Sequence, residues 1–144
     1  MLEEYYSREK IELRTGGEKA YYNPTKDFIR VPAFEDFKTE HDYYDVLFHE
    51  TVHSTGHKSR LNRIETTTYG TDPYAKEELV AEIGSAYLCA MFGVFQETAK
   101  NQTAYIQNWT AKIKQDKYML VSAFNKAEKA VELIEGNQGE EDDM

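Results

Sequence analysis

The strongest constraint on this chain is the run His49-Glu50-Thr51-Val52-His53, which sets two histidines four positions apart. Residues four apart lie on one face of an α-helix, about one turn from each other, so both imidazoles can point at a single metal ion. Glu50 projects about 100° around the helix from His49, where it can reach a water on that ion without binding the ion itself. The run therefore predicts a helix that carries two metal ligands and a general base.

The flanking residues support this helix. A five-residue pattern of this kind occurs by chance in about one chain in a hundred of this composition, so the pattern alone is not decisive. Residues 42–48 contain no helix breaker, the first turn is acidic after a start at Thr39 or Glu40, and Gly56 is a suitable stop. All four histidines also fall between residues 41 and 57, as expected of a metal centre.

A third ligand is required, because a catalytic zinc site usually has three protein ligands and one open position. Asp72-Pro73 is a favourable helix start and Gly93 a stop, so a second helix is predicted from Tyr74 to about Phe92. Glu78 and Glu82 share one face of that helix. We assign Glu78 as the third ligand and Glu82 as the carboxylate that accepts a ring N–H from a ligating histidine, and the reverse assignment stays open.

Further candidates lie beside these residues. His57 can turn back toward the metal as a transition-state donor or as a hydrogen-bonding partner, although an exposed loop histidine is the simpler interpretation. Tyr69 and Tyr74 precede the second helix and could donate a hydrogen bond to a developing oxyanion. Glu77 is expected to point to solvent. A three-histidine site is disfavoured, because Ser59 stands where its third histidine would lie.

Two other features have simple interpretations. The basic residues Lys58, Arg60 and Arg63 could bind a carboxylate or phosphate of a substrate, but a solvated loop is the commoner role of such residues. Cys89 is expected to be a thiol in the core. Because it is the single cysteine of the chain, an internal disulfide is excluded.

The residues before the motif predict a small sheet. Residues 2–10 contain helix formers and are expected to form a short helix at an edge. Residues 11–14 and 19–22 alternate on either side of a Gly-Gly turn, which predicts a hairpin, and residues 27–31 form a third strand. The first third of the chain is therefore predicted as a small antiparallel sheet, and the whole chain as an α+β fold.

The end of the chain is predicted to be helical. One or two helices are expected over residues 102–115 and 117–135. Their predicted buried side consists of Tyr105, Ile106, Trp109, Ile113, Leu120, Phe124 and Val131. We expect residues 1–135 to form one domain and residues 136–144 to form a disordered acidic tail.

Charge and composition restrict the partners. The net charge of -9 and the pI near 4.9 argue against direct nucleic-acid binding by this chain, because such binding normally needs clustered Lys and Arg. The sequence contains no signal peptide and no apolar run of membrane-spanning length. A cytoplasmic location without membrane association is therefore expected.

Several linked stretches resemble one known family. They are Ala20-Tyr21-Tyr22-Asn23-Pro24, residues 27–32, Tyr43-Tyr44 with residues 49–57, residues 60–63, and residues 74–82. Together they resemble the C-terminal zincin-like metallopeptidase domain of ArdC-type antirestriction proteins, which are carried on plasmids and other mobile elements. The match runs roughly from residue 11 to residue 135.

The resemblance implies a zincin-like fold with the layout of thermolysin-type zincins, in which Glu78 matches the third ligand. Glu82 stands where that class usually has the shorter Asp. Full-length members place an N-terminal single-stranded-DNA-binding domain before this one. The chain is therefore expected to be either a domain of a longer protein or a stand-alone version.

The leading hypothesis is a zinc-dependent metallopeptidase that acts on a peptide or protein substrate. His49, His53 and Glu78 hold Zn²⁺, and Glu50 takes a proton from the attacking water. The alternative is a non-catalytic interaction module of an antirestriction protein, in which the metal site stabilises the fold or a partner surface.

Overall fold

A computed structural model describes residues 1–64, 72–95, 107, 111 and 117–136. Tyr69, most of the helix predicted over residues 102–115, and the acidic tail from residue 137 lie outside the described residues. Those predictions therefore stay untested.

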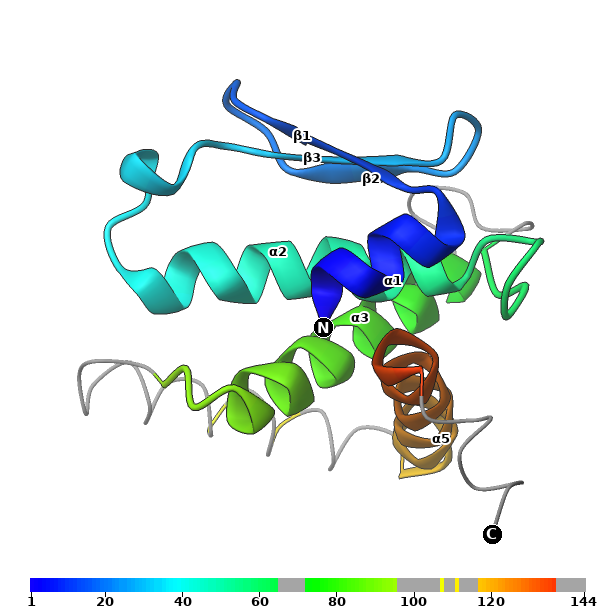
Figure 1. Cartoon of the computed structure of the whole chain (residues 1–144). Coiled ribbons are helices and arrows are strands. Elements are labelled where there is room, and N and C mark those ends of the chain that lie inside the picture. The colour runs from blue at the N-terminus through cyan, green and yellow to red at the C-terminus, as the bar shows by residue number, and fades with distance from the viewer. Residues whose placement is uncertain (65–71, 96–106, 108–110, 112–116, 137–144) are drawn as a thin grey trace, which may run out of the picture.

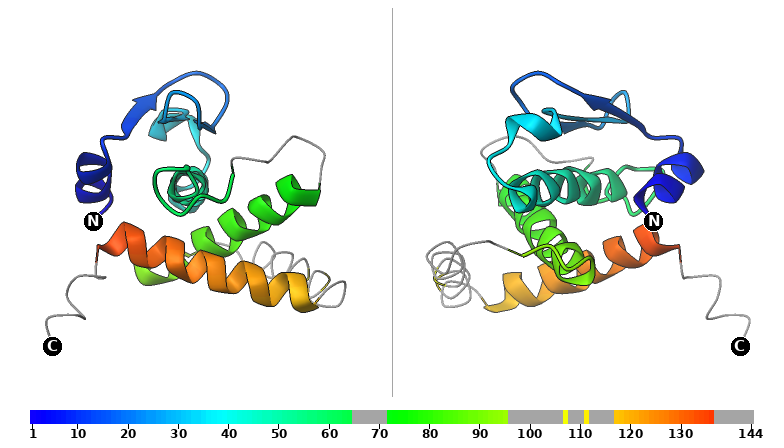
Figure 2. Two further views of the ribbon diagram at one scale, coloured as in Figure 1. Left: turned by 90° about the vertical axis from the view of Figure 1, so that its right-hand side faces the viewer. Right: turned by 60° about the vertical axis from the view of Figure 1, so that its left-hand side comes forward.

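The motif helix is the middle layer of the fold. The elements in chain order are α1 (Leu2–Glu9), β1 (Glu12–Thr15), β2 (Tyr21–Asn23), β3 (Phe28–Val31), the 3-10 turn η1 (Phe34–Asp36), α2 (Glu40–Thr55), α3 (Asp72–Met91) and α5 (Lys117–Glu135). The sheet lies on one side of α2, and α3 and α5 lie on the other side (Figure 1). Figure 2 shows the same order of layers in two further views. The α+β class predicted from the sequence is confirmed.

The sheet is mixed, so the predicted antiparallel pairing was wrong. β1 runs parallel to β3, with Glu12 opposite Phe28, and β2 runs antiparallel to β3, which gives the order β1-β3-β2. The hairpin predicted between the first two strands does not form. β3 is the most buried strand of the three, with Phe28, Ile29 and Val31 all buried. A strand with apolar side chains is stabilised most by burial at the central position of the sheet. This stabilisation outweighs the advantage of pairing β1 with β2 across their short connection.

The predicted ends of α2 are confirmed. The side chain of Thr39 accepts a hydrogen bond from the backbone N–H of Asp42 at 3.0 Å, which satisfies one free donor of the first turn. At the other end the backbone N–H of Gly56 donates to the carbonyl of His53. These local contacts fix the helix that carries both histidines.

Helix α1 is less peripheral than its sequence indicates. Tyr5 is fully buried, and its hydroxyl lies 2.8 Å from the Ser54 hydroxyl of α2. The Tyr6 hydroxyl lies 2.6 Å from that of Thr51. Burial raises the pKa of Tyr5 to about 12, so both groups are neutral partners at physiological pH. The short helix thus anchors the C-terminal half of α2, through polar contacts that hydrophobic periodicity does not reveal.

Helices α3 and α5 agree with the sequence in position and only partly in burial. α3 ends before Gly93, which has the left-handed φ of 69° that favours glycine after a helix. On α5, Leu120 and Val131 are buried as predicted, but Phe124 is 50 % exposed. Cys89 is buried in α3, as predicted, and burial raises the pKa of its thiol to about 12. None of the described helices is long and apolar enough to cross a membrane.

Gly84 allows α2 and α3 to approach closely. A Cβ at this position would lie 2.7 and 3.0 Å from the two methyl carbons of Val52. A Gly→Ala change inside a helix normally stabilises by about 1 kcal/mol. Here we expect Gly84→Ala to lower the free energy of unfolding by about 1–3 kcal/mol, because overpacking forces the helices apart.

Urea denaturation checks this prediction. The control is Val52→Ala, alone and combined with Gly84→Ala. Val52→Ala removes the methyl groups that would clash with a Cβ at position 84. The double variant should therefore lose less unfolding free energy than the two single variants lose together. Additive effects, or a Gly84→Ala variant as stable as the parent, would contradict the close approach.

Candidate metal centre

Three side chains from α2 and α3 converge on one point. His49 and His53 come from α2, and Glu78 comes from the second turn of α3. The Nε2 atom of His49 lies 3.1 Å from Glu78 Oε2, and Nε2 of His53 lies 2.9 Å from Glu78 Oε1. Hydrogen bonds from both histidines hold the pKa of the Glu78 carboxyl far below its usual value.

This donor set fits a divalent metal ion. One ligand atom from each of the three residues lies within 4.8 Å of the others. Two ligands about 2.1 Å from a tetrahedral ion are about 3.4 Å apart, slightly more than the 3.1 and 2.9 Å between the Glu78 oxygens and the two histidines. Two imidazoles and one carboxylate form the usual protein ligand set of a catalytic zinc site. The structure therefore brings together the three residues that the sequence analysis proposed as ligands.

Glu77 supports the site, and the prediction that it points to solvent was wrong. Its side chain is buried, and Oε2 accepts a hydrogen bond from Nδ1 of His53 at 2.9 Å. Arg63 donates to both carboxylate oxygens of Glu77, at 2.9 and 3.1 Å. Burial alone would raise the pKa of Glu77, but these two partners lower it. The carboxylate is therefore charged, and it orients the ring of His53 so that Nε2 faces Glu78.

Glu82 was predicted to accept a ring N–H from one of the ligating histidines. At His53 the Nδ1 side is taken by Glu77. Glu82 lies one turn beyond Glu78 on α3 and is partly buried. Its predicted contact with a ligating histidine stays a prediction for His49.

Glu50 lies beside the ligands at a cavity wall. The cavity has a volume of about 340 Å³ and is lined by Ala20, Tyr21, Tyr22, Pro24, His49, Glu50, His53, Ile64, Tyr74 and Glu78. Burial raises the pKa of the Glu50 carboxyl, while the two histidines and the backbone N–H of Tyr22 oppose this shift. A carboxylate with a raised pKa next to a metal-ligand cluster is suited to accept and release a proton.

Tyr74 and His57, two candidate hydrogen-bond donors at the site, occupy different places in the structure. Tyr74 lines the cavity together with the three ligand residues, where a hydrogen-bond donor to an oxyanion is needed. His57 instead lies in the turn after α2, where its Nδ1 atom is 2.8 Å from the Ser59 hydroxyl. The simpler interpretation predicted this loop position, but His57 is partly buried and not exposed.

Arg60 and Arg63 are structural residues and not a solvated basic loop. The side chain of Arg60 is only 2 % exposed, and its guanidinium donates to both oxygens of Asp27, at 2.9 and 2.7 Å. It also donates to Glu9 Oε1 at 3.1 Å and to the carbonyl of Ser54 at 3.1 Å. One guanidinium thus ties α1, the β2–β3 turn and the end of α2 together.

This network extends to the general-base candidate. Asp27 accepts a hydrogen bond of 2.6 Å from the hydroxyl of Tyr22. Tyr22 in turn donates its backbone N–H to Glu50. Asp27 and Tyr22 both lie in the stretches that resemble the family, but the sequence alone predicts no role for either of them. The sequence does not show that Arg60 is buried or that Asp27 has a left-handed φ of 56°. The contact between these two residues therefore becomes visible only in the folded structure.

The ligand assignment gives a direct prediction. Glu78→Gln should weaken metal binding by at least about 100-fold, because a neutral amide replaces the anionic ligand. Glu82→Gln makes the same chemical change one turn away on α3 and should leave metal affinity near that of the parent. Competition with a fluorescent chelator measures both values. If Glu82→Gln loses the metal and Glu78→Gln retains it, the reverse assignment is correct.

Several known proteins share sequence with this chain. The family model described as zincin-like metallopeptidase matches residues 1–126. The uncharacterized protein y4eC of Sinorhizobium fredii (strain NBRC 101917 / NGR234) is 33 % identical over 130 residues, which cover 90 % of this chain and 42 % of that protein. A DNA primase TraC of Escherichia coli is 34 % identical over 117 residues, which cover 81 % of this chain and 11 % of TraC. The chain therefore spans less than half of these relatives.

Solved structures agree with the sequence matches. The Mn(II)-bound crystal structure of the antirestriction protein ArdC from plasmid R388 superposes with a TM-score of 0.71 at 39 % identity, over 94 % of this chain and 51 % of ArdC. The metal-free ArdC structure gives a TM-score of 0.67 at 40 % identity, over 94 % of this chain and 49 % of ArdC. These matches confirm the fold and the resemblance inferred from the sequence. The chain belongs to the zincin-like metallopeptidase family.

Proposed function

We propose that this chain is a zinc-dependent peptidase domain that works within a longer, ArdC-like antirestriction protein of a mobile element. The observation that carries the proposal is the convergence of His49, His53 and Glu78 beside a partly buried Glu50 at one cavity. A zinc ion, when bound, supplies Lewis acidity, which acidifies water and polarises a carbonyl group. The remaining chemistry belongs to side chains of the chain itself.

Glu50 is the proton carrier in this proposal. Its carboxylate accepts a proton from the water that attacks the peptide carbonyl, and then delivers that proton to the leaving amine. The raised pKa of Glu50 favours this exchange, because a more basic carboxylate holds the proton until the amine takes it. The N–H of Tyr22 orients the carboxylate, and Tyr74 is the candidate donor to the oxyanion.

A survey of peptide cleavage tests the proposal. The full chain is stripped of metal with a chelator, reloaded with zinc, and incubated with peptides of varied sequence, and mass spectrometry detects new termini. We expect cleavage by the zinc-loaded protein, loss after chelation, and recovery when zinc is restored. Zinc-loaded protein that cuts no peptide, although zinc raises its melting temperature, would instead support the second candidate function.

The second candidate is a non-catalytic module whose metal stabilises the fold or a partner surface. The favouring observation is that the three ligands bridge α2 and α3, two helices that pack closely at Gly84. A metal at that position would cross-link them whether or not a peptide is cut. In this case Glu50→Gln would leave antirestriction intact in cells, while Glu78→Gln would abolish it.

A further inference from the structure

A second cavity lies between α3 and α5, away from the metal ligands. It has a volume of about 290 Å³ and is lined by Lys76, Val80, Tyr118, Met119, Ser122, Ala123 and Lys126. An adjoining cavity of about 260 Å³ shares Lys76, Val80 and Lys126, and adds Arg63, Pro73 and Glu77. Because these cavities share three lining residues, they adjoin each other, and we call the two together the α3–α5 groove.

The groove is positively charged in an acidic protein. Its ionisable lining residues are Lys76, Lys126, Arg63 and Glu77, three positive charges against one negative charge, whereas the whole chain carries -9. Arg63 and Glu77 neutralise each other through their ion pair. Lys76 and Lys126 have no ion pair within the described part of the chain, so the groove holds two like charges without a counter-charge. Two exposed ammonium groups that line one groove give it a positive local potential, which is suited to an anion.

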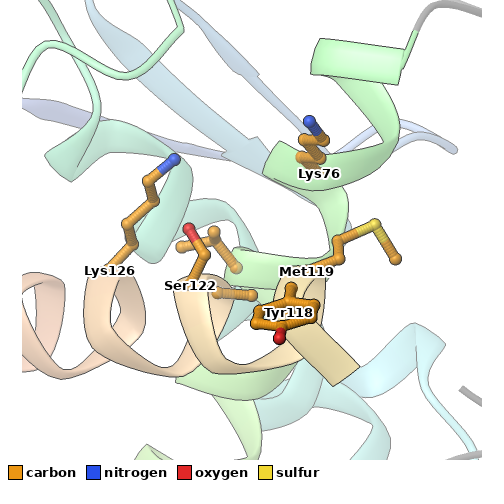
Figure 3. A pocket seen from close by; sticks show the side chains of 7 residues that line it. Lys76, Tyr118, Met119, Ser122 and Lys126 are labelled. Carbon is orange, nitrogen blue, oxygen red and sulfur yellow. The ribbon is translucent and has the colours of Figure 1, made fainter. Parts of the chain in front are cut away.

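The hydrogen-bond donors of the groove also favour an anion as its ligand. Figure 3 shows Lys126 and Ser122 next to each other on α5 and Lys76 across from them on α3. Pro73, at the start of α3, lines the same groove, where the positive end of the helix dipole adds to the field. Two ammonium groups and one hydroxyl are suitable donors for the oxygens of a phosphate group.

An exposed aromatic ring completes the groove. Tyr118 lines it (Figure 3), and its side chain is 91 % exposed, so its ring packs little against the described part of the chain. Buried Val80 and Ala123 form an apolar base. A cationic groove with an exposed aromatic ring matches the chemistry of a phosphate ester that carries a base, since the ring can stack on the base while the lysines hold the phosphate.

We propose that the α3–α5 groove binds the phosphate group of a nucleotide or of a single-stranded polynucleotide, with Lys76 and Lys126 as its charged donors. The expectation from net charge was no nucleic-acid binding by this chain. Local potential and not net charge decides such binding, so a groove of this kind can act on an acidic domain. The proposal is independent of peptide hydrolysis.

Titration of the full chain with three probes tests the proposal. The probes are pyrophosphate, thymidine monophosphate and a short oligothymidylate, each measured by calorimetry at low salt. We expect saturable binding with a dissociation constant on the order of 0.1–1 mM for the tightest probe. Tightest binding of the mononucleotide identifies a free nucleotide as the ligand class, and tightest binding of the oligomer identifies a polynucleotide.

Matched charge reversals show whether binding occurs in the groove. Lys76→Glu and Lys126→Glu should each weaken binding by about tenfold or more, and each should flatten the salt dependence of oligomer binding by about 0.7 log units per log unit of salt. Lys129→Glu makes the same change on α5 but lies outside the groove, and it should alter binding less than twofold.

A footprint on the unmodified protein gives a second readout. The bound probe should protect Lys76 and Lys126 from acetylation and leave Lys129 reactive. The proposal is overturned if no probe binds saturably, if Lys129→Glu weakens binding as much as the groove variants, or if all three lysines are protected equally. None of these results bears on peptide cleavage, which the metal-loaded protein tests separately.

Discussion

Glu50→Gln is expected to retain the metal and to lose peptide cleavage by about 10²–10⁴-fold, the usual contribution of a general base. Gln has nearly the shape of Glu and can still accept the N–H of Tyr22, but it cannot take a proton from water. His49, His53 and Glu78 are untouched, so metal content by elemental analysis should match that of the parent. Cleavage is measured with the best substrate found in the peptide survey.

Asp45→Asn is the matched control for this prediction. Asp45 lies on α2 about one turn before His49, and its side chain accepts a hydrogen bond of 2.7 Å from Ser85. The amide oxygen of Asn can accept the same bond, so cleavage should stay near the parent rate. An equal loss of cleavage rate in Glu50→Gln and Asp45→Asn would show that removing any negative charge from α2 lowers the activity. Undiminished turnover by Glu50→Gln would remove Glu50 from the chemistry.

Arg60→Met is expected to lower the free energy of unfolding by about 3 kcal/mol at neutral pH, because it leaves two partly buried carboxylates without their buried partner. The side chain of Arg60 is 2 % exposed, whereas those of Asp27 and Glu9 are 25 % and 24 % exposed. Met fills a similar volume, so lost packing contributes little. Urea denaturation followed by circular dichroism measures the change.

The effect of Arg60→Met should depend on pH. Burial alone would raise the pKa of Asp27, but hydrogen bonds from Arg60 and Tyr22 hold it below the ordinary value of 3.8. A depressed folded-state pKa stabilises the protein above the unfolded-state value, and this stabilisation is lost as the pH falls through the folded-state pKa. The difference between parent and variant should therefore narrow below pH 3.8. A difference that stays constant with pH would show that Arg60 acts by packing alone.

Arg14→Met is the control for the arginine itself. Arg14 pairs with Glu12 at 3.0 Å on the surface, where both side chains are exposed. An exposed pair of this kind contributes little, because solvent and salt screen it. The stability of Arg14→Met should therefore stay close to that of the parent at every pH.

The sequence predicts the two site-bearing helices well, because their ends are encoded locally. Thr39 and Gly56 bound α2 through contacts within one turn, and Pro73 and Gly93 mark the limits of α3 in the same way. The spacing of His49 and His53 is a property of any helix. These elements and the three proposed ligands needed no knowledge of the tertiary fold beyond the meeting of two helices.

Strand order and ion-pair partners were not predictable in the same way. The central position of β3 depends on which strand buries the most area against α2, a property of the whole fold. Glu77 was placed in solvent because α3 was treated as having one buried face. The consecutive buried residues Leu79, Val80 and Ala81 show that α3 is covered on more than one side. That run of apolar residues was the available signal for a buried Glu77.

The contact of Glu77 with both His53 and Arg63 restricts how this domain can diverge. Arg63 lies in the connection after α2, and its side chain is as well buried as that of Glu77. Losing either member alone strands a charge in the interior, whereas losing both at once removes the penalty. Viable variants at positions 63 and 77 should therefore arise as pairs. Sequence change in the connection after α2 is therefore constrained by the histidine at the proposed metal site.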